Sequence, residues 1–189
     1  MMRLPQKQSA FTLIEIVIVI ALSVSVVVAL TFLLYTFNKA SLYGQVSSQS
    51  SDSASALLRD IESLTLPANA VLETHAFSGA TYTSTATSLV LELPSIDGSG
   101  NVIANAHDYV AFYAVGTNAY RLLEKDAVSG RVAGTKLLSS TLDTLSFAYD
   151  NATFADVRTV TVDIQTQAQV KEEVITNHLS QQIRLRNHQ

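Results

Sequence analysis

A long uncharged apolar segment near the N-terminus limits most strongly what this chain can fold into. From Ile16 to Asn38, 23 consecutive residues carry no formal charge. As a helix they would extend roughly 34 Å, which is enough to cross a membrane. A secretory signal peptide has a shorter apolar stretch, of about 7–15 residues, followed by a small-residue cleavage site. The sequence after residue 37, NKASLYG, is a poor site of that kind, so we predict an uncut membrane-spanning helix at this position.

The charges on either side of this segment predict its orientation. Arg3 and Lys7 precede it, and basic flanks remain on the cytoplasmic side of a membrane. We therefore expect a single-pass membrane protein with a cytoplasmic N-terminus and an extracytoplasmic head. From residue 10 onward, 10 basic residues stand against 16 acidic ones, so we predict no direct nucleic-acid binding. The absence of cysteine excludes disulfides and thiolate metal sites.

One carboxylate, that of Glu15, stands at the head of the apolar segment. An ionisable residue at the centre of a spanning helix costs about 2.5–3.5 kcal/mol, so a purely mechanical anchor gains nothing from it. One interpretation is that Glu15 marks the helix start, where the helix dipole stabilises a carboxylate by about 0.3–1 kcal/mol. That interpretation does not account for the four largely apolar residues, 11–14, that precede it. The alternative is a function for the carboxylate within the membrane.

The segment KQSAFTLIEIVIVIAL, residues 7–22, resembles the N-terminus of type IV prepilins and pseudopilins. These have a short basic leader, a small residue, then Phe, Thr, Leu, an aliphatic residue, Glu and a long aliphatic helix. In that family a membrane-embedded prepilin peptidase cuts before the Phe and methylates the new amine. The resemblance implies cleavage between Ala10 and Phe11 and N-methylation of Phe11. The chain departs from the family at Ala10, where Gly is usual, which implies slower or tolerated processing.

The same resemblance implies a role for Glu15 in assembly and a set of partners. The methylated amine of an incoming subunit would pair with Glu15 of a neighbour and set the register of a growing fibre. The implied partners are the prepilin peptidase, other pilins or pseudopilins of the same fibre, an inner-membrane assembly platform and membrane lipid. The tip-most pseudopilin typically lacks this Glu, so the presence of Glu15 implies a position beside or beneath the tip subunit. After assembly the protein would belong to a pilus or pseudopilus.

Beyond the apolar segment the sequence predicts an amphipathic helix followed by strands. Apolar residues from Leu42 to Leu64 recur near the helical period, SSQSSDSAS (47–55) supplies a polar face, and Pro67 closes the segment. Strands are predicted over 88–93, 109–115, 118–124, 145–150, 160–165 and 182–186, with loops over 94–107, 127–134 and 150–154. The turn GTN (116–118) predicts that the strands 109–115 and 118–124 form a hairpin. One helix against an antiparallel sheet makes the fold class α+β.

The order of these pieces resembles the J- or W-like minor pseudopilins and minor pilins. That resemblance implies a pilin-like fold, in which a long N-terminal helix spans the membrane with its first half and packs on a β-sheet head with its second. We accordingly expect four parts: a prepilin leader (1–10), a transmembrane and polymerisation helix (11–37), an amphipathic continuation (38–66) and a β-rich head (67–189).

Candidate residues for chemistry are few. The four histidines, His75, His107, His178 and His188, are too scattered in sequence to form a metal-binding pair, and we predict that each lies on the surface or in a turn. No nucleophile, phosphate-binding or dinucleotide-binding motif occurs. The tripeptide NAT (151–153) matches a glycosylation sequon, but a turn explains it equally. We therefore expect neither a catalytic site nor a cofactor.

A short polar stretch partly matches a calcium loop. Asp97, Ser99 and Asn101 alternate, and Asp108 follows eleven residues after Asp97. The Gly expected at the sixth position is Val102, and a Gly/Asp turn explains the stretch without a metal. We predict a turn here and no metal site.

The expected function is that of a non-enzymatic minor pilin or pseudopilin of a type IV pilus-like or type II secretion-like machine, serving secretion, competence, adhesion or motility. The alternative is a membrane-anchored extracellular binding domain that does not polymerise. A third possibility is an anchored enzyme. The first two differ in N-terminal processing and in the role of Glu15, whereas an enzyme requires a cleft that gathers acids or bases.

Overall fold

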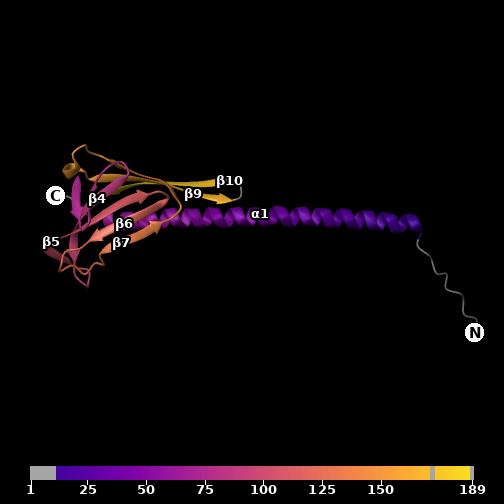
Figure 1. Ribbon diagram of the computed structural model, residues 1–189, viewed down its shortest axis with the longest axis horizontal. Coiled ribbons are helices and arrows are strands. Elements are labelled where there is room, and N and C mark those ends of the chain that lie inside the picture. Colours follow the sequence, from indigo (N-terminus) through magenta and orange to yellow (C-terminus); the bar gives the residue numbers. More distant parts are fainter. Residues whose placement is uncertain (1–11, 171–172, 188–189) are drawn as a thin grey trace, which may run out of the picture. The chain divides into compact units, whose positions relative to one another are not determined.

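The structure of the protein is a computed structural model that describes residues 12–170 and 173–187. Its elements, labelled in Figure 1, are α1 (Leu13–Thr65), β1 (Ala70–Val71), β2 (Thr74–Phe77), β3 (Ala80–Thr83), β4 (Ser88–Ile96), β5 (Val102–Val115), β6 (Asn118–Glu124), β7 (Gly134–Ser139), β8 (Leu142–Tyr149), the 3₁₀ helix η1 (Phe154–Asp156), β9 (Thr159–Val170) and β10 (Glu173–Arg184). The chain divides into two units, residues 1–44 and 45–189. We call residues 13–44 the apolar half of α1 and residues 45–65 its docked half.

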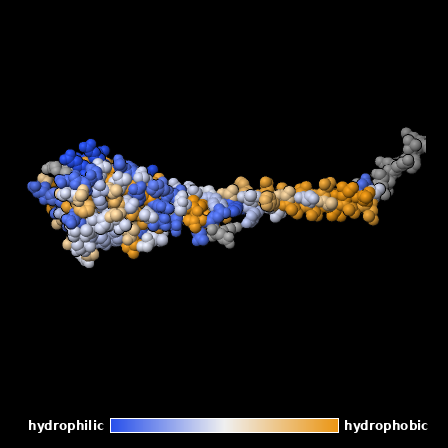
Figure 2. Space-filling model, turned by 90° about the horizontal axis from the view of Figure 1, so that it is seen from above, coloured by the Kyte–Doolittle hydropathy of each residue, from blue (hydrophilic) through white to orange (hydrophobic). Residues whose placement is uncertain are grey.

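The apolar half of α1 has the length and composition of a membrane-spanning helix. Its most apolar 18 residues have a mean hydropathy of 3.0, and none of them is buried. Every side chain from residue 12 to residue 38 is exposed, and Figure 2 shows an almost continuous apolar surface along this part of the helix. Apolar side chains on all faces of one helix are stable only when lipid or other proteins cover them. The predicted long N-terminal apolar helix is confirmed.

The docked half of α1 is amphipathic and packs against the head with one face. Its buried residues are Ser50, Ala54, Leu57, Ile61 and Thr65. They follow each other at intervals of three or four, the spacing of one helical face. The helix ends at Thr65, two residues before Pro67, as Pro67 predicts. The Ser-rich stretch 47–55 is not simply the polar outer face that we expected, because Ser50 is fully buried.

The head contains two antiparallel sheets and a separate hairpin. The larger sheet has the strand order β1-β4-β5-β6-β7 and the smaller has the order β10-β9-β8, while among the described residues β2 pairs only with β3. All of these pairings are antiparallel, so the α+β fold class is confirmed. The expectation of a single sheet was wrong. Alternation of apolar residues predicts strands, but it does not show which strands pair.

One main hydrophobic core joins the docked half of α1 to both sheets. It is formed by Ala54, Leu57, Ile61, Ala68, Val71, Leu89, Leu91, Leu93, Val110, Phe112, Ala119, Leu142, Leu145, Phe147, Val157, Val160, Val162, Ile164, Ile183 and Leu185. A second, smaller cluster contains Phe77 of β2, Val90 of β4 and Ala111 of β5. Residues of β4 therefore alternate between the two clusters, because successive side chains of a strand point to opposite faces. The β2–β3 hairpin covers the face of the larger sheet opposite the main core.

The predicted loop over 94–107 was wrong for most of its length. β4 continues to Ile96 and β5 begins at Val102, so only residues 97–101 form the turn between them. The two strands meet here through polar groups, since the Ser95 hydroxyl donates a 2.7 Å hydrogen bond to buried Asp108. A polar pair of this kind leaves no apolar alternation in the sequence, which is why the strand extensions were missed.

One other strand was predicted with its exact bounds, and others were predicted in the right place but too short. β6 coincides with the predicted strand 118–124, and it pairs with β5 across the predicted turn. β9 and β10 run for 12 residues each and form the long hairpin visible in Figure 1, whereas only 160–165 and 182–186 were predicted. The end of β9 and the start of β10 have many polar side chains, so the alternation of apolar and polar residues is weak there. The short strands β1, β2 and β3 and the exposed β7 were not predicted.

Candidate functional site

The first turn of α1 holds Glu15 in a reciprocal cap with Thr12. The Thr12 backbone N–H and hydroxyl donate to Glu15 Oε2 over 2.8 and 2.9 Å, and the Glu15 N–H donates to Thr12 Oγ1 over 3.3 Å. This T-x-x-E arrangement is a capping box, which satisfies two backbone donors that a helix start leaves unpaired. Glu15 therefore has a local structural role at the start of the helix.

The cap leaves part of the Glu15 carboxylate available. Within the part of the chain that the structure describes, Oε1 of Glu15 takes no hydrogen bond, and the residue is exposed. An ionised carboxylate has about four acceptor positions across its two oxygens, and the cap uses two of them. The predicted cleavage and methylation residues, Ala10 and Phe11, lie outside the described residues. Their arrangement around Glu15 therefore stays a prediction.

Thr12 is the functional residue that sequence reasoning missed. It was counted only among the residues on the cytoplasmic side of Glu15. The signal was present, because Thr followed three residues later by Glu, just before an apolar run, is the sequence signature of a capping box.

Hydroxyl side chains along the apolar half of α1 bond within the same helix. Ser25 donates to the Ala21 carbonyl over 2.9 Å, Thr31 to the Val27 carbonyl over 2.8 Å, and Thr36 to the Phe32 carbonyl. Each bond reaches back four residues, which is the usual bond for a hydroxyl in a helix. In a membrane, where no water is present to pair a hydroxyl, these bonds lower the cost of the polar residues.

The residues of the partial calcium loop serve two separate structures. Asp97 accepts hydrogen bonds from the N–H groups of Ser99 and Asn101 and from the Asn101 side chain, which together hold the pKa of Asp97 below its usual range. Asp108 instead lies buried beside Arg131, with 2.6 Å between its Oδ2 and Arg131 Nη1. Asp97 stabilises the predicted turn, and Asp108 already has a cationic partner.

The three described histidines have different environments. His107 and His178 are exposed, as predicted, and lie 3.1 Å from Glu92 and 3.4 Å from Asp163. His75 lies in β2 and is only partly exposed; it stacks on Tyr109 with ring centroids 3.8 Å apart, and its Nε2 lies 3.8 Å from Glu124 Oε2. These ring and carboxylate neighbours of His75 come from β5 and β6, and the spacing of the histidines in the sequence did not reveal them. His188 lies outside the described residues.

The comparisons with known proteins identify the N-terminal segment. A family model described as the prokaryotic N-terminal methylation motif matches residues 5–31. This motif is the signature of type IV prepilins and pseudopilins, and it includes Ala10, Phe11 and Glu15. A search of curated proteins and a search of solved structures each gave no match. The motif does not address the J- or W-like subtype, which stays a prediction.

Proposed function

We propose that this chain, which carries the type IV prepilin and pseudopilin signature over residues 5–31, is a minor pilin or pseudopilin. It is cut by a prepilin peptidase between Ala10 and Phe11, is methylated at Phe11 and enters a pilus-like or type II secretion-like fibre near its tip. The head lies outside the cytoplasm, and the protein has no enzymatic activity. Its partners are the other pilins of the fibre and the inner-membrane assembly platform.

The observation that carries this proposal is the position of Glu15 within the matched signature. It is a single carboxylate at the start of a helix whose next 23 residues are uncharged and exposed. After cleavage the Phe11 amine of a neighbouring subunit offers such a carboxylate a partner. Two charges 4 Å apart at an effective dielectric near 20 attract by about 4 kcal/mol before desolvation, which is an upper bound. The exposed apolar surface of the same helix supplies the packing area that a fibre core needs.

The capping box is compatible with this role. Thr12 uses acceptor positions of Oε2, and Oε1 stays available for an amine from a neighbour. The cap also fixes the χ angles of Glu15, so less side-chain entropy is lost when the pair forms. A carboxylate that is already held in place therefore sets the register of a neighbouring subunit at a smaller entropy cost than a mobile one.

The same cap favours a second candidate function, a membrane-anchored binding domain that does not polymerise. In one chain alone, Glu15 accepts two hydrogen bonds from Thr12 and stabilises the start of α1. A carboxylate with that structural role needs no neighbouring subunit to explain it. N-terminal processing and the effect of changing Glu15 separate the two candidates.

The first test is the N-terminus of the mature protein. Intact-mass measurement and N-terminal sequencing of the chain from its own host should give a start at Phe11 with a methylated amine. The Ala10→Gly variant, which restores the residue usual in the family, should be processed at least as fast. A mature start after residue 37, or an uncut chain, would favour the binding-domain candidate.

The second test separates two roles of Glu15: capping the start of α1, and pairing with the amine of a neighbouring subunit. Glu15→Leu should be inserted and cleaved but should lose crosslinking to sibling pilins, because a neighbouring amine then lies in lipid without a partner. Glu15→Gln should also lose crosslinking, since the amide carries no charge. Thr12→Ala weakens the cap and keeps the carboxylate, so among cleaved chains it should crosslink as wild type does. If Thr12→Ala fails as severely as Glu15→Leu, or if Glu15→Leu crosslinks normally, the cap is the role of Glu15.

A further inference from the structure

A shallow pocket in the head brings together three arginines from different parts of the sequence. The pocket has a volume of about 470 Å³ and is lined by Leu66, Arg158, Arg184, Leu185 and Arg186. Leu66 follows the end of α1, Arg158 precedes β9, and Arg184 is the last residue of β10. Two backbone hydrogen bonds join these segments, from Leu185 N–H to the Arg158 carbonyl and from Arg186 N–H to the Leu66 carbonyl, both 2.9 Å. The position of all three arginines is thus set by the fold.

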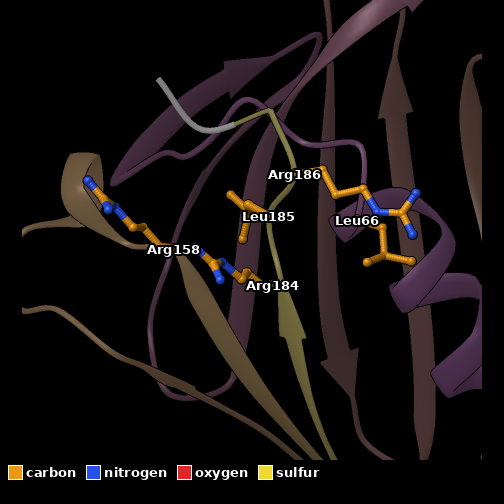
Figure 3. Close-up of a pocket in the computed structure, with 5 residues that line it drawn as sticks. All are labelled: Leu66, Arg158, Arg184, Leu185 and Arg186. Atoms are coloured by element: carbon orange, nitrogen blue, oxygen red, sulfur yellow. The ribbon is translucent and has the colours of Figure 1, made fainter.

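Arg184 and Arg186 stand on either side of a buried leucine and are directed outward. Leu185 is 4% exposed and belongs to the main core, while Arg184 and Arg186 on either side of it are exposed. Figure 3 shows the guanidinium group of Arg184 directed toward the side of Arg158 and that of Arg186 directed the other way, beside Leu66. The three cationic groups are therefore spread along the pocket and do not converge on one point.

The arginines of this pocket differ from the other arginines of the head in having no anionic partner among the residues that the structure describes. Arg121 pairs with Asp60 at 2.8 Å, and Arg131 pairs with Asp108 at 2.6 Å. Within residues 12–170 and 173–187, no carboxylate pairs with the side chains of Arg158, Arg184 or Arg186, and their guanidinium groups donate no hydrogen bond. An anion from outside the chain would supply the partner that these exposed guanidinium groups lack among the described residues. Their grouping is notable because the chain as a whole carries a charge of −4.

The directions of the arginine side chains indicate the shape of the anion. Strand β10 ends at Arg184 and Arg186 lies in the bend that follows, so their guanidinium groups point to different sides of the pocket (Figure 3). An extended acidic peptide can offer a separate carboxylate to each of them, and Arg binds a carboxylate through two parallel hydrogen bonds. A single compact phosphate would instead need guanidinium groups that converge. The leucines of the pocket can contact the aliphatic parts of such a peptide.

We propose that the pocket of Arg158, Arg184 and Arg186 binds an extended acidic segment of a partner protein, with several Asp or Glu residues along it. This assigns to the head a docking surface that is separate from the N-terminal motif. The inference stands on the head alone and does not depend on cleavage at Ala10 or on fibre formation, so either can fail while the other holds.

The test uses the full chain in an uncharged detergent and a fluorescent peptide, acetyl-Asp-Ser-Asp-Ser-Asp-Ser-Asp-amide. Fluorescence anisotropy should show saturable binding that weakens as salt is added, because the contacts are ionic. The double variant Arg184→Gln with Arg186→Gln should weaken binding at least tenfold. Replacing both arginines by Lys should give an intermediate loss, since Lys keeps the charge but lacks the planar fork.

Matched controls separate this site from general charge effects. Arg59 of α1 is exposed and lies outside the pocket, so Arg59→Gln should change the affinity less than twofold. A peptide with Asn in place of each Asp should not bind. The proposal is overturned if the acidic peptide does not bind, or if it binds the double variant and Arg59→Gln equally. It is also overturned if inorganic phosphate or glycerol phosphate at equal concentration displaces the peptide, because the pocket would then be a site for compact oxyanions.

Discussion

Hydroxyl side chains occur in both halves of α1, but they bond to different parts of the molecule. In the apolar half, the hydroxyls of Ser25, Thr31 and Thr36 bond to carbonyls one turn back in the same helix. In the docked half, Ser50 bonds to Thr166 and Ser53 bonds to Ser139, both at 2.9 Å and from distant segments. A helix in lipid must satisfy its own polar groups, whereas a helix on a protein surface can use them to fix its position.

The carboxylates of the two units show the same contrast. Glu15 is satisfied by Thr12, three residues away. Asp108 is satisfied by Ser95, Ser129, Arg131 and the Asp126 N–H, which lie 13 to 23 residues away. Because its polar groups bond to near neighbours in the sequence, the first unit can form a helix without tertiary contacts. The head depends on hydrogen bonds and ion pairs between residues far apart in the sequence. The following predictions test that difference.

The largest effect is expected for Asp108→Asn. Arg131, whose side chain is 11% exposed, would keep its charge without an anionic partner. Breaking a buried ion pair in this way costs roughly 3–5 kcal/mol of the free energy of unfolding. Urea denaturation followed by far-UV circular dichroism at neutral pH measures it. Asp143→Asn in β8 is the control, because Asp143 is exposed and should give less than about 0.5 kcal/mol.

The pH dependence of this variant has a definite sign. Burial raises the pKa of Asp108, but hydrogen bonds from Asp126 N–H, Ser129, Ser95 and Arg131 outweigh burial and hold that pKa below its usual value. The stabilisation is therefore present above the unfolded pKa of about 3.9 and is lost as the pH falls through the lowered folded value. Wild type and Asp108→Asn should differ most near neutral pH and converge in strong acid. An equal gap at pH 7 and in strong acid would contradict the role of the charge.

The next largest effect should come from replacing a leucine of α1 by alanine, and the same substitution is compared in the two halves of the helix. Leu57 in the docked half is 1% exposed, so Leu57→Ala should lower the free energy of unfolding of the head by roughly 2–5 kcal/mol. Leu30 in the apolar half is 53% exposed, and Leu30→Ala should leave it unchanged. Equal losses in the two variants would show that the apolar half also contributes to the stability of the head.

A smaller effect on the free energy of unfolding is expected when a single serine hydroxyl is removed from either half of α1. Ser50→Ala should destabilise the head by about 1 kcal/mol, since buried Thr166 loses one partner but keeps the Ser50 carbonyl at 3.2 Å. Ser25→Ala removes only a bond within the helix and should not alter unfolding of the head. The same denaturation experiment compares them, and an effect of Ser25→Ala as large as that of Ser50→Ala would contradict the contrast.

The smallest effect is expected when the first unit is removed almost completely. A chain of residues 41–189 keeps the docked half of α1 and both sheets, so it should fold as a soluble monomer with mixed helix and strand. Its free energy of unfolding should match that of the full chain in detergent within about 0.5 kcal/mol. A disordered or purely helical spectrum would show that the head needs the apolar half.

The parts of this fold that were predictable are those whose pattern is local. The uncharged run after Glu15 indicated a spanning helix, Pro67 indicated the helix end, and the turn at residues 116–117 indicated the β5–β6 hairpin. The extension of β5 through Asp108 was not predictable, because a buried polar residue has the same appearance in sequence as one in an exposed loop. Likewise, the strand predicted over 182–186 includes Arg184 and Arg186, but nothing in the sequence brought Arg158 beside them.

The sequence alone determined the character of the first unit, since a run of apolar residues, a capping box and a prepilin-like motif are all contained within some 30 neighbouring residues. Local bonds and hydrophobicity suffice there, and no distant partner changes the outcome. Only the tertiary structure decided that the strands divide into two sheets, that Ser50 faces Thr166 and that three arginines line one pocket. The last two depend on contacts between residues far apart in the chain: Ser50 and Thr166 are separated by 116 positions, and the Arg186 N–H donates to the Leu66 carbonyl. Side-chain alternation indicates which face of a strand is buried, but not which segment covers it.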